Sequence, residues 1–325
     1  MKVGVLGCGG MGNVHSSKYS QMSGVALYAY DQDAERQSAL CERHGAEPVG
    51  SRDALIEVCD VLDVCLPTTL HTDAVVAGLE AGKPTLVEKP MGRTNEDCLR
   101  MCDATAQTGT LLMPAQVARW FREHRAAHEA VRDGRIGRPA SVRLRRGGGA
   151  PRGEWFLDHA ASGGILLDLA VHDFDWLLWT LGPAQRVTSR TVRLGQTVAG
   201  AEFKGDFAQT TVLFQSGAVA TVVNTWMDPA GFRTTIEAAG DGGLIEFDSR
   251  TNPAIRVASA GGQRAENPYA AEDDPYYSQL SAFLAAARGE APVPIKPEEG
   301  AAAVRLALAA IESAETGQPV LMHGP

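Results

Sequence analysis

The sequence predicts an α/β protein of two domains, in which a doubly wound parallel sheet comes first and an α+β domain with a mainly antiparallel sheet follows. Three observations support this. The chain has 325 residues, which is longer than one hydrophobic core usually grows. Its first third alternates short apolar runs with helical stretches, whereas the later part has consecutive strand-like runs joined by glycine turns. We expect the domains to span residues 1–119 and 120–325.

The first domain is expected to contain five strands. They are KVGVLG (2–7), VALYAY (25–30), VLDVCL (61–66), PTLVEK (84–89) and TLLMPA (110–115). Helical patterns follow the first four, beginning near Met11, Asp33, His71 and Asn95. Strands that are apolar on both faces and alternate with helices are typical of a parallel sheet covered on both sides.

The second domain begins with a helical stretch from about Trp120 to Arg132. Another helix is expected around LLDLAVHDFDW (166–176), and two more at 276–288 and 297–316. Strand-like runs lie at 140–146, 186–194, 209–214, 218–226, 234–240 and 243–247. Because turns such as QSG and GDGG join most of these runs without a helix between them, an antiparallel meander is expected.

Composition excludes several classes of protein. A formal net charge of -9 and a pI near 5.4 give no basic surface for nucleic acid or an anionic membrane. No apolar run approaches the roughly 18 to 20 residues that a membrane span needs, and the N-terminus lacks a signal-peptide core. The six cysteines form no C-x-x-C pair, so neither a disulfide framework nor a zinc ribbon is suggested. We expect a cytoplasmic enzyme.

A glycine fingerprint, G-C-G-G-M-G, closes the first strand and opens the first helix. Gly7 permits a tight turn, Gly9 lets the backbone approach a pyrophosphate, and Gly12 lets the helix pack on the strand. Asp31 ends the next strand, 19 residues after Gly12, where an acid would accept both ribose hydroxyls. The predicted dinucleotide site therefore comprises Gly7, Gly9, Gly10, Met11, Gly12 and Asp31.

The acidic run from Asp31 to Asp33 favours NAD over NADP, because it would repel a 2′-phosphate and Arg36 is the nearby cation. Flavin or S-adenosylmethionine remains an alternative ligand for the glycine loop. Two further polar clusters end later strands, at Pro67-Thr68-Thr69-Leu70-His71 and at Glu88-Lys89. Ligands of doubly wound sheets lie beyond these strand ends. Lys89 is either a solvated strand end or a group that projects over the nicotinamide.

Asp168, His172 and Asp175 are spaced by four and three residues, which would place them on one face of a continuous helix. A metal site would need a further ligand, and no such motif is recognisable, so no metal is predicted. His172-Asp173 also resembles the dyad of HD-type metal phosphohydrolases, but that alternative leaves the glycine fingerprint unexplained. His124 and His128 are expected on an exposed helix face.

These motifs together resemble the Gfo/Idh/MocA oxidoreductase family, the group of glucose-fructose oxidoreductase and inositol 2-dehydrogenase. In family order the chain has the fingerprint with His15, Pro67-Thr68 with His71, Glu88-Lys89-Pro90, and Ser162-Gly163-Gly164 before Asp168 and His172. Arg119-Trp120 is similar to its Arg-aromatic pair at the domain junction. The resemblance covers nearly the whole chain.

The resemblance implies a Rossmann domain that binds NAD, then an open-faced α+β domain whose exposed sheet forms a homodimer or homotetramer interface. It implies that Lys89, Asp168 and His172 are catalytic. Pro67, Thr68, His71 and Glu88 would line the cofactor, whereas His15 is expected to be a packing residue near the pyrophosphate. Arg119 and Trp155 are candidate substrate contacts, and Asp175 is expected to make a structural hydrogen bond more readily than a substrate contact.

The expected reaction is oxidation of a secondary hydroxyl of a cyclic polyol or sugar by hydride transfer to NAD. An imidazole with a pKa near 6.5 suits His172 as proton acceptor, and an ammonium suits Lys89 as the group that polarises the oxygen. Lys89 as the base is an open alternative. So are a transient keto-sugar used for glycoside cleavage, reduction of imines or C=C bonds, and a non-catalytic NAD-binding regulator. Substrate identity depends on loops around 147–160, 226–233 and 265–277.

Overall fold

The computed structural model describes most of the chain. The described ranges are 1–149, 154–192, 196–198, 201–203, 207–228, 230–251, 255–259, 262–266 and 274–322. Parts of the three loops expected to select the substrate therefore lie outside the described residues. The chain divides into two compact units, one made of 1–117 with 272–301 and the other of 118–271 with 302–325. The predicted boundary at 119/120 assigns residues 272–301 to the second domain, whereas the structure groups them with the first unit.

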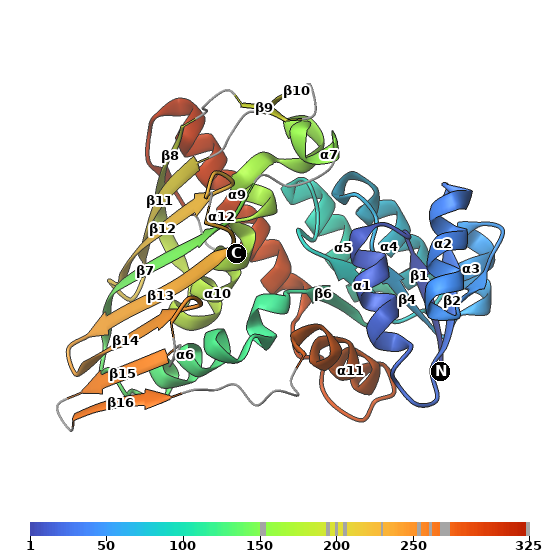
Figure 1. The fold of residues 1–325 in the computed structure, drawn as a ribbon, viewed down its shortest axis with the longest axis horizontal. Helices are drawn as coiled ribbons and strands as arrows, with labels where there is room; N and C mark the ends of the chain where they lie inside the picture. The colour runs from blue at the N-terminus through green and yellow to red at the C-terminus, as the bar shows by residue number, and fades with distance from the viewer. Residues whose placement is uncertain are drawn as a thin grey trace. The chain divides into compact units, whose positions relative to one another are not determined.

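The first unit is built on a six-stranded parallel sheet in the order β3-β2-β1-β4-β5-β6 (Figure 1). Its strands are β1 (Lys2–Leu6), β2 (Ala26–Tyr30), β3 (Glu47–Pro48), β4 (Val61–Val64), β5 (Thr85–Glu88) and β6 (Leu112–Ala115). Its helices are α1 (Gly10–Tyr19), α2 (Ala34–His44), α3 (Arg52–Val58), the 3-10 turn η1 (Thr68–Leu70), α4 (His71–Glu80), α5 (Asn95–Thr108) and α11 (Pro275–Ala287). The predicted doubly wound sheet is confirmed.

Local sequence explains where these helices begin. The Asp33 side chain accepts hydrogen bonds from the N–H groups of Glu35 and Arg36 and so caps α2. Thr94 and Asp97 form a reciprocal capping box at the start of α5. Because the strands run parallel, the loops that follow β1, β2, β4 and β5 leave the sheet at the same carboxyl edge.

The second unit carries a nine-stranded sheet in its described part, in the order β16-β15-β14-β13-β7-β12-β11-β8-β17. The strands are β7 (Pro139–Gly147), β8 (Ala184–Val192), β11 (Phe207–Phe214), β12 (Val219–Thr225), β13 (Arg233–Gly240), β14 (Gly243–Asp248), β15 (Ile255–Ser259), β16 (Gly262–Glu266) and β17 (Val320–Leu321), beside a separate hairpin of β9 (Gln196–Val198) and β10 (Ala201–Phe203). All neighbours in the large sheet are antiparallel except β7 and β12, which run parallel. The expected mainly antiparallel sheet is confirmed.

Helices cover one face of this sheet, while the opposite face carries none among the described residues (Figure 1). The helices are η2 (Val117–Trp120), α6 (Arg122–Arg132), α7 (Glu154–Leu157), α8 (His159–Ser162), α9 (Gly164–Asp168), α10 (Val171–Leu181) and α12 (Pro297–Thr316), of which α12 begins in the first unit. Along β12, Ala220, Val222 and Asn224 are fully buried, whereas the alternate residues Thr221 and Val223 are partly exposed. This period of two separates a covered face from an open one.

The continuous helix expected around 166–176 is wrong in one respect. The structure ends α9 at Asp168 and begins α10 at Val171, with a turn at Leu169 and Ala170. The Ala170 N–H donates to the Ile165 carbonyl, skipping the normal four-residue step. Asp168 therefore belongs to a different helix from His172 and Asp175, and the three residues do not share one continuous helix face. No described helix is long and apolar enough to cross a membrane.

Candidate active site

The glycine loop after β1 has the backbone that the fingerprint requires. Gly7 adopts a φ of 101°, and a Cβ there would lie 2.7 Å from the Cys65 carbonyl oxygen. A Cβ on Gly12 would meet the carbonyl oxygen of Gly7. Both positions therefore need glycine for packing within the protein itself.

Gly9 and Gly10 are different, because a Cβ at either position would meet no heavy atom within 4 Å. They lie at the N-terminus of α1, whose first N–H groups have no partner within the helix. Open space beside a helix N-terminus suits close approach of a pyrophosphate to the backbone. Met11 follows in the first turn of α1. The loop therefore fits a dinucleotide.

Asp31 follows β2, and its side chain joins the loop after β2 to the glycine loop after β1. One carboxylate oxygen accepts the Cys8 N–H at 2.7 Å and the other accepts the Asp33 N–H at 2.9 Å. Each carboxylate oxygen can accept a second hydrogen bond, so the oriented group can still receive ribose hydroxyls. Arg36 is exposed and pairs with Asp33 at 3.1 Å.

The segments after β4 and β5 form the next part of the site. Pro67 is exposed and precedes η1, in which Thr68 is 3% exposed. The His71 ring is buried between the two segments: Nε2 lies 2.8 Å from the Leu66 carbonyl oxygen and Nδ1 lies 3.1 Å from that of Pro90. Burial lowers the pKa of His71, opposed by these carbonyl groups. His71 thus holds together the two segments that carry Thr68 and Lys89.

Glu88 is the last residue of β5 and is 4% exposed, whereas Lys89 is partly exposed. The Glu88 carboxylate accepts the N–H of Lys89 at 2.9 Å. The peptide bond between Lys89 and Pro90 is cis. Lys89 therefore sits in a turn whose backbone is held by the preceding side chain.

Glu88 also contacts a buried group that the sequence analysis did not foresee. His15 Nε2 lies 3.2 Å from Glu88, and His15 Nδ1 lies 2.8 Å from Asp63, a fully buried carboxylate within β4. The signal was the single acid in the apolar run VLDVCL, which we interpreted as an ordinary buried strand. His15 is buried, as its expected packing role requires, but its partners are charged.

In the second unit, Asp168 is the last residue of α9 and is 7% exposed, and His172 is the second residue of α10 and is partly exposed. Trp155 is a partly exposed residue of α7, and its ring lies edge-on to Phe156 at 4.8 Å between centroids. The structure places Asp168, His172 and Trp155 on three different helices of one unit.

Arg119 and Asp175, expected to have separate roles, form a buried ion pair. Arg119 donates from Nε and from one terminal nitrogen to the two Asp175 oxygens, at 2.8 and 2.6 Å. The Arg119 guanidinium also lies 5.2 Å from the Trp179 ring centre. This bidentate pair fixes η2 against α10.

Asp173, directly after His172, is buried as well. It accepts hydrogen bonds from Arg146 of β7 at 2.9 Å and from Asn224 of β12 at 2.8 Å. These contacts tie α10 to the two parallel strands of the sheet. They occupy both oxygens of Asp173, which disfavours the HD-type metal dyad. His172 is therefore followed on α10 by two anchored acids, Asp173 and Asp175.

The prediction that His124 and His128 lie on an exposed helix face is wrong. Their exposed fractions are 5% and 7%. His124 Nε2 lies 3.1 Å from Arg146, and the His128 ring stacks on Trp179 with centroids 3.4 Å apart. Burial and Arg146 lower the pKa of His124 well below its usual range. Their partners come from β7 and α10, too distant in the sequence for a local pattern to reveal.

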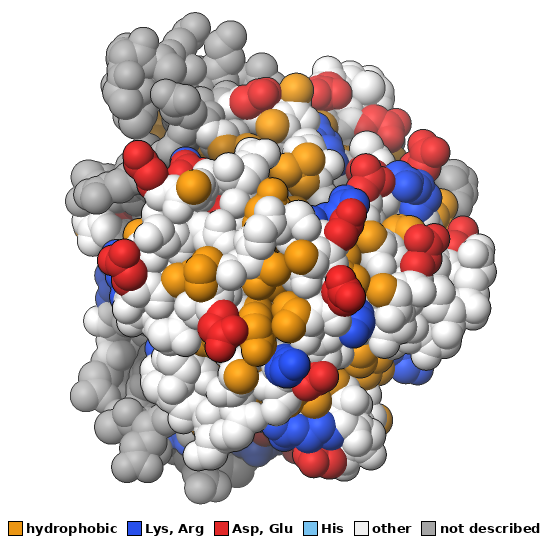
Figure 2. Space-filling model, turned by 90° about the vertical axis from the view of Figure 1, so that its right-hand side faces the viewer, with side chains coloured by type: hydrophobic (Ala, Val, Ile, Leu, Met, Phe, Trp, Pro, Cys, Tyr) orange, Lys and Arg blue, Asp and Glu red, His pale blue; other side chains and the backbone are white. Residues whose placement is uncertain are grey.

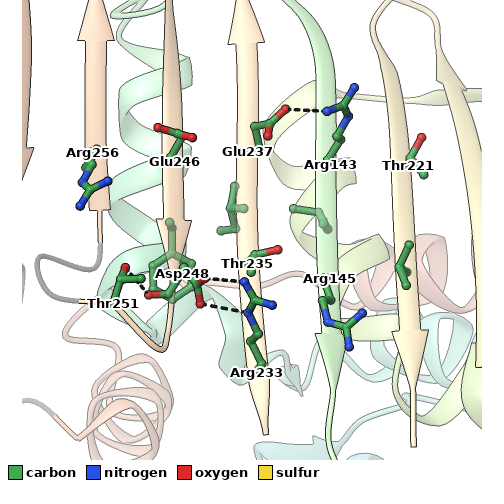
Figure 3. A pocket seen from close by; sticks show the side chains of 14 residues that line it. Arg143, Arg145, Thr221, Arg233, Thr235, Glu237, Glu246, Asp248, Thr251 and Arg256 are labelled. Carbon is green, nitrogen blue, oxygen red and sulfur yellow. Dashed lines mark hydrogen bonds and ion pairs between the residues drawn. The ribbon is translucent and has the colours of Figure 1, made fainter. Parts of the chain in front are cut away.

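A cavity of about 490 Å³ lies on the open face of the nine-stranded sheet (Figure 3). Its charged lining is largely paired: Arg143 with Glu237 at 3.2 Å and Arg233 with Asp248 at 2.6 Å. None of the predicted site residues lines it. The predicted site residues of the first unit lie on the glycine loop and at the strand ends instead.

Figure 2 shows the face that lies to the right in Figure 1, where α2 and α3 are drawn. Among the described residues on this face, acidic and basic side chains are interspersed. This mixture matches the acidic net charge and gives no basic stripe that would bind a nucleic acid backbone.

Comparison with known proteins assigns both parts of the chain. Residues 1–116 match the oxidoreductase family model with an NAD-binding Rossmann fold, and residues 124–246 match the GFO/IDH/MocA C-terminal domain. The chain is 28% identical to a myo-inositol 2-dehydrogenase of Thermotoga maritima over 99% of both chains. It is 32% identical to a 1,5-anhydro-D-fructose reductase of Ensifer adhaerens over 91% of this chain and 90% of the relative.

A solved structure of a myo-inositol dehydrogenase from Corynebacterium glutamicum superposes with a TM-score of 0.84 at 25% identity, covering 100% of this chain and 99% of the other. The observed fold and glycine loop agree with both family models. The chain is an oxidoreductase acting on CH–OH groups and belongs to the Gfo/Idh/MocA family.

Proposed function

We propose that the protein is an NAD-dependent dehydrogenase that oxidises a secondary hydroxyl of a cyclic polyol or sugar. The observation that carries this proposal is the carboxyl edge of the first sheet, where open glycine positions at a helix N-terminus, an oriented Asp31 and Lys89 lie on neighbouring loops. The inositol dehydrogenases and the anhydrofructose reductase among its relatives support a polyol or sugar substrate.

NAD is proposed over NADP. The Asp31 carboxylate is fixed by two backbone N–H groups and would repel a 2′-phosphate, while the nearby Arg36 is paired with Asp33. Gly9 and Gly10 leave room for the pyrophosphate. Thr68 and Glu88 would line the cofactor. Bound NAD would supply the acceptor for the hydride.

In the proposed mechanism, the substrate carbon gives up a hydride and its hydroxyl gives up a proton. His172 accepts the proton, and the Lys89 ammonium stabilises the negative charge that develops on the oxygen. Asp168 holds a neighbouring hydroxyl, and Trp155 offers an aromatic surface to the ring of the substrate. Arg119 supports this arrangement indirectly, because its guanidinium is committed to Asp175.

A substrate screen tests the proposal. Inositols, aldoses, glycosides and sugar acids are offered with NAD, and NADH is followed by its absorbance. Stoichiometric NADH from a free polyol or sugar supports it. Cleavage of a glycoside without net NADH would show instead that oxidation is transient, and binding of NADH without turnover of any candidate would point to a regulator.

We also propose that the open face of the nine-stranded sheet joins subunits into a homodimer or homotetramer. Apolar side chains such as Val223 share this face with the paired charges of Arg143 and Glu237, so a second copy could meet both kinds of group (Figure 3). Light scattering after size exclusion measures the mass directly. A monomer of 34.5 kDa at micromolar concentration would contradict this assembly.

A further inference from the structure

A cluster of polar side chains is buried inside the first unit, next to Glu88. It consists of His15 from α1, Asp63 of β4, Cys65 directly after β4, and Glu88 at the end of β5. Their exposed fractions are 0%, 0%, 8% and 4%. Removing such groups from water is costly unless they compensate one another, so their contacts are informative.

The His15 ring lies between the two carboxylates. Nδ1 is 2.8 Å from Asp63 Oδ2 and Nε2 is 3.2 Å from Glu88 Oε1. Nδ1 is hydrogen-bonded to Asp63, whereas Nε2 and Oε1 form no hydrogen bond and lie only within ion-pair distance. An ion pair with Glu88 requires a protonated imidazolium ring. Burial lowers the pKa of His15, but the Asp63 carboxylate and the hydrogen bonds with Asp63 and Cys65 outweigh it, and the pKa is raised well above its usual range.

The other groups around the ring are neutral near pH 7. Burial is the main cause that raises the pKa of the Cys65 thiol and of the Tyr19 hydroxyl of α1. From α11, Tyr276 approaches with its ring centre 6.3 Å away, and the charged pair of Lys18 and Asp274 joins the same two helices at 2.8 Å. The carboxylates that face His15 are therefore Asp63 and Glu88, and Asp63, which is hydrogen-bonded to the ring, raises its pKa.

His15, Asp63 and Cys65 offer ligand atoms within 4.8 Å of one another, as a metal site would. Direct hydrogen bonds already link them, because the Cys65 thiol lies 3.4 Å from both His15 and Asp63. A raised thiol pKa also opposes the thiolate form that binds metals. The hydrogen bonds account for this geometry without an ion.

Glu88 connects the cluster to Lys89. Glu88 Oε1 faces His15, while Glu88 Oε2 accepts the Lys89 N–H at 2.9 Å. The carboxylate thus accepts a hydrogen bond from the backbone of Lys89 at one oxygen and faces the imidazole at ion-pair distance with the other. A change in the charge of His15 would release one of these two attachments.

We propose that His15, held by Asp63, is a positioning residue that acts through Glu88 to fix the turn carrying Lys89. This inference rests on the proposed function for the role of Lys89. Replacing His15 would leave Glu88 with one attachment, and small displacements of a reacting group are enough to cost about tenfold to a hundredfold in rate.

The first test needs no substrate. Correlation spectra of ¹⁵N-labelled histidine rings, recorded on the protein without added cofactor at about pH 8, report whether His15 carries two N–H protons, well above the ordinary pKa of about 6.5. We expect an imidazolium that His15→Gln removes, which assigns the signal, and that Asp63→Asn converts to the neutral ring. A neutral His15 in the wild type overturns the proposal.

The second test is a double-mutant cycle of His15→Gln and Glu88→Gln, with Cys65→Ala as the control for packing at the same place. We expect His15→Gln to lower kcat by about tenfold or more, while the KM for the polyol stays close to wild type. The double variant should be no worse than the poorer single variant. Additive losses, or a loss equal to that of Cys65→Ala, would refute a connection through Glu88.

The pH profile distinguishes positioning from simple structural support. Because the pKa of His15 is raised in the wild type, we expect its ring to contribute no ionisation to kcat within the assay range. In Asp63→Asn, burial still lowers the pKa of His15, but the carboxylate that raises this pKa is absent. His15 should then titrate within the assay range and add a new ionisation to the pH profile of kcat. If Asp63→Asn only lowers the melting temperature and leaves the profile unchanged, the proposal is wrong.

Lys89→Met separates this inference from the proposed function. If that variant keeps its turnover, the catalytic role of Lys89 fails, and the link from His15 to catalysis fails with it. If Lys89→Met is inactive while His15→Gln, folded by its melting temperature, is fully active, the inference alone fails. Should His15→Gln not fold, Asp63→Asn and the ring spectra of the wild type still decide.

Discussion

Arg119 and Asp175 form a bidentate ion pair that is almost fully buried, with side-chain exposures of 7% and 1%. Breaking a buried pair leaves an uncompensated charge and costs about 3–5 kcal/mol. We therefore expect Asp175→Asn to lower the free energy of unfolding by about 3 kcal/mol or more in urea titrations. Asp133→Asn, which breaks the exposed pair with Arg132, should cost at most about 1 kcal/mol. Equal losses of unfolding free energy in the two variants would mean that the buried pair stabilises the protein no more than the exposed pair does.

A substitution at Gly9 tests cofactor binding separately from folding. A methyl group at this position meets no protein atom within 4 Å, so Gly9→Ala should unfold at the wild-type temperature. The same methyl would stand where a pyrophosphate approaches, and we expect NADH to bind at least about tenfold more weakly, or ~1.4 kcal/mol. NADH fluorescence titration measures this. Gly50→Ala, equally open and following β3, which β2 separates from β1 in the sheet, should bind NADH normally.

Asp31 should set the choice between NAD and NADP. Removing the carboxylate in Asp31→Ser loses hydrogen bonds to a charged acceptor, about 1.5–3 kcal/mol in NAD affinity, and removes the repulsion of a 2′-phosphate. The ratio of kcat/KM for NAD over NADP is the measurement, and it should fall. Asp60 accepts the Lys2 N–H at the opposite edge of the same sheet. Asp60→Asn should leave the ratio unchanged, and a fall there would contradict a local effect.

The parts of the fold that the sequence predicts are those with local signals. Such signals place the run from Lys2 to Leu6, the glycine loop and the strand that ends at Glu88. In each case the spacing of apolar residues, the turn residues and the helix start lie within a few positions of one another. The same locality predicted Asp31 at the end of β2. Residues whose environment depends on neighbours in the sequence were therefore predictable.

Long-range partners explain the rest. The parallel pairing of β7 with β12 joins Ser141 to Val219 across the intervening helices, which no local pattern encodes. His124 looked exposed because its partner Arg146 belongs to that sheet. Asp63 looked like a strand residue of no consequence because His15 lies 48 positions earlier. A buried charge in an apolar strand is nevertheless a signal that a partner exists.

His128 makes stability depend on pH. Burial, with Arg132 and Arg119, lowers its pKa from 6.5 to about 4. The unfolded chain therefore binds the proton more readily, so stability is full above about pH 6.5 and is lost as the pH falls toward about 4. His128→Phe keeps an aromatic ring against Trp179 but cannot titrate. Unfolding free energies of this variant should fall less steeply between these two pH values, by up to about one proton. Identical slopes would show that His128 does not contribute.

Lys89 and His172 should each be needed for turnover. Lys89→Met and His172→Ala are expected to lose at least about a hundredfold in kcat, the lower end of general acid–base effects, while still binding NADH. Near-normal turnover by both variants would refute the assignment. Lys83 provides the matched control, since it precedes β5 as Lys89 follows it and donates to the Cys59 carbonyl. Lys83→Met removes the same charge from the other end of the same strand, so a comparable loss there would mean that the charge of the domain, and not the position of Lys89, governs the rate.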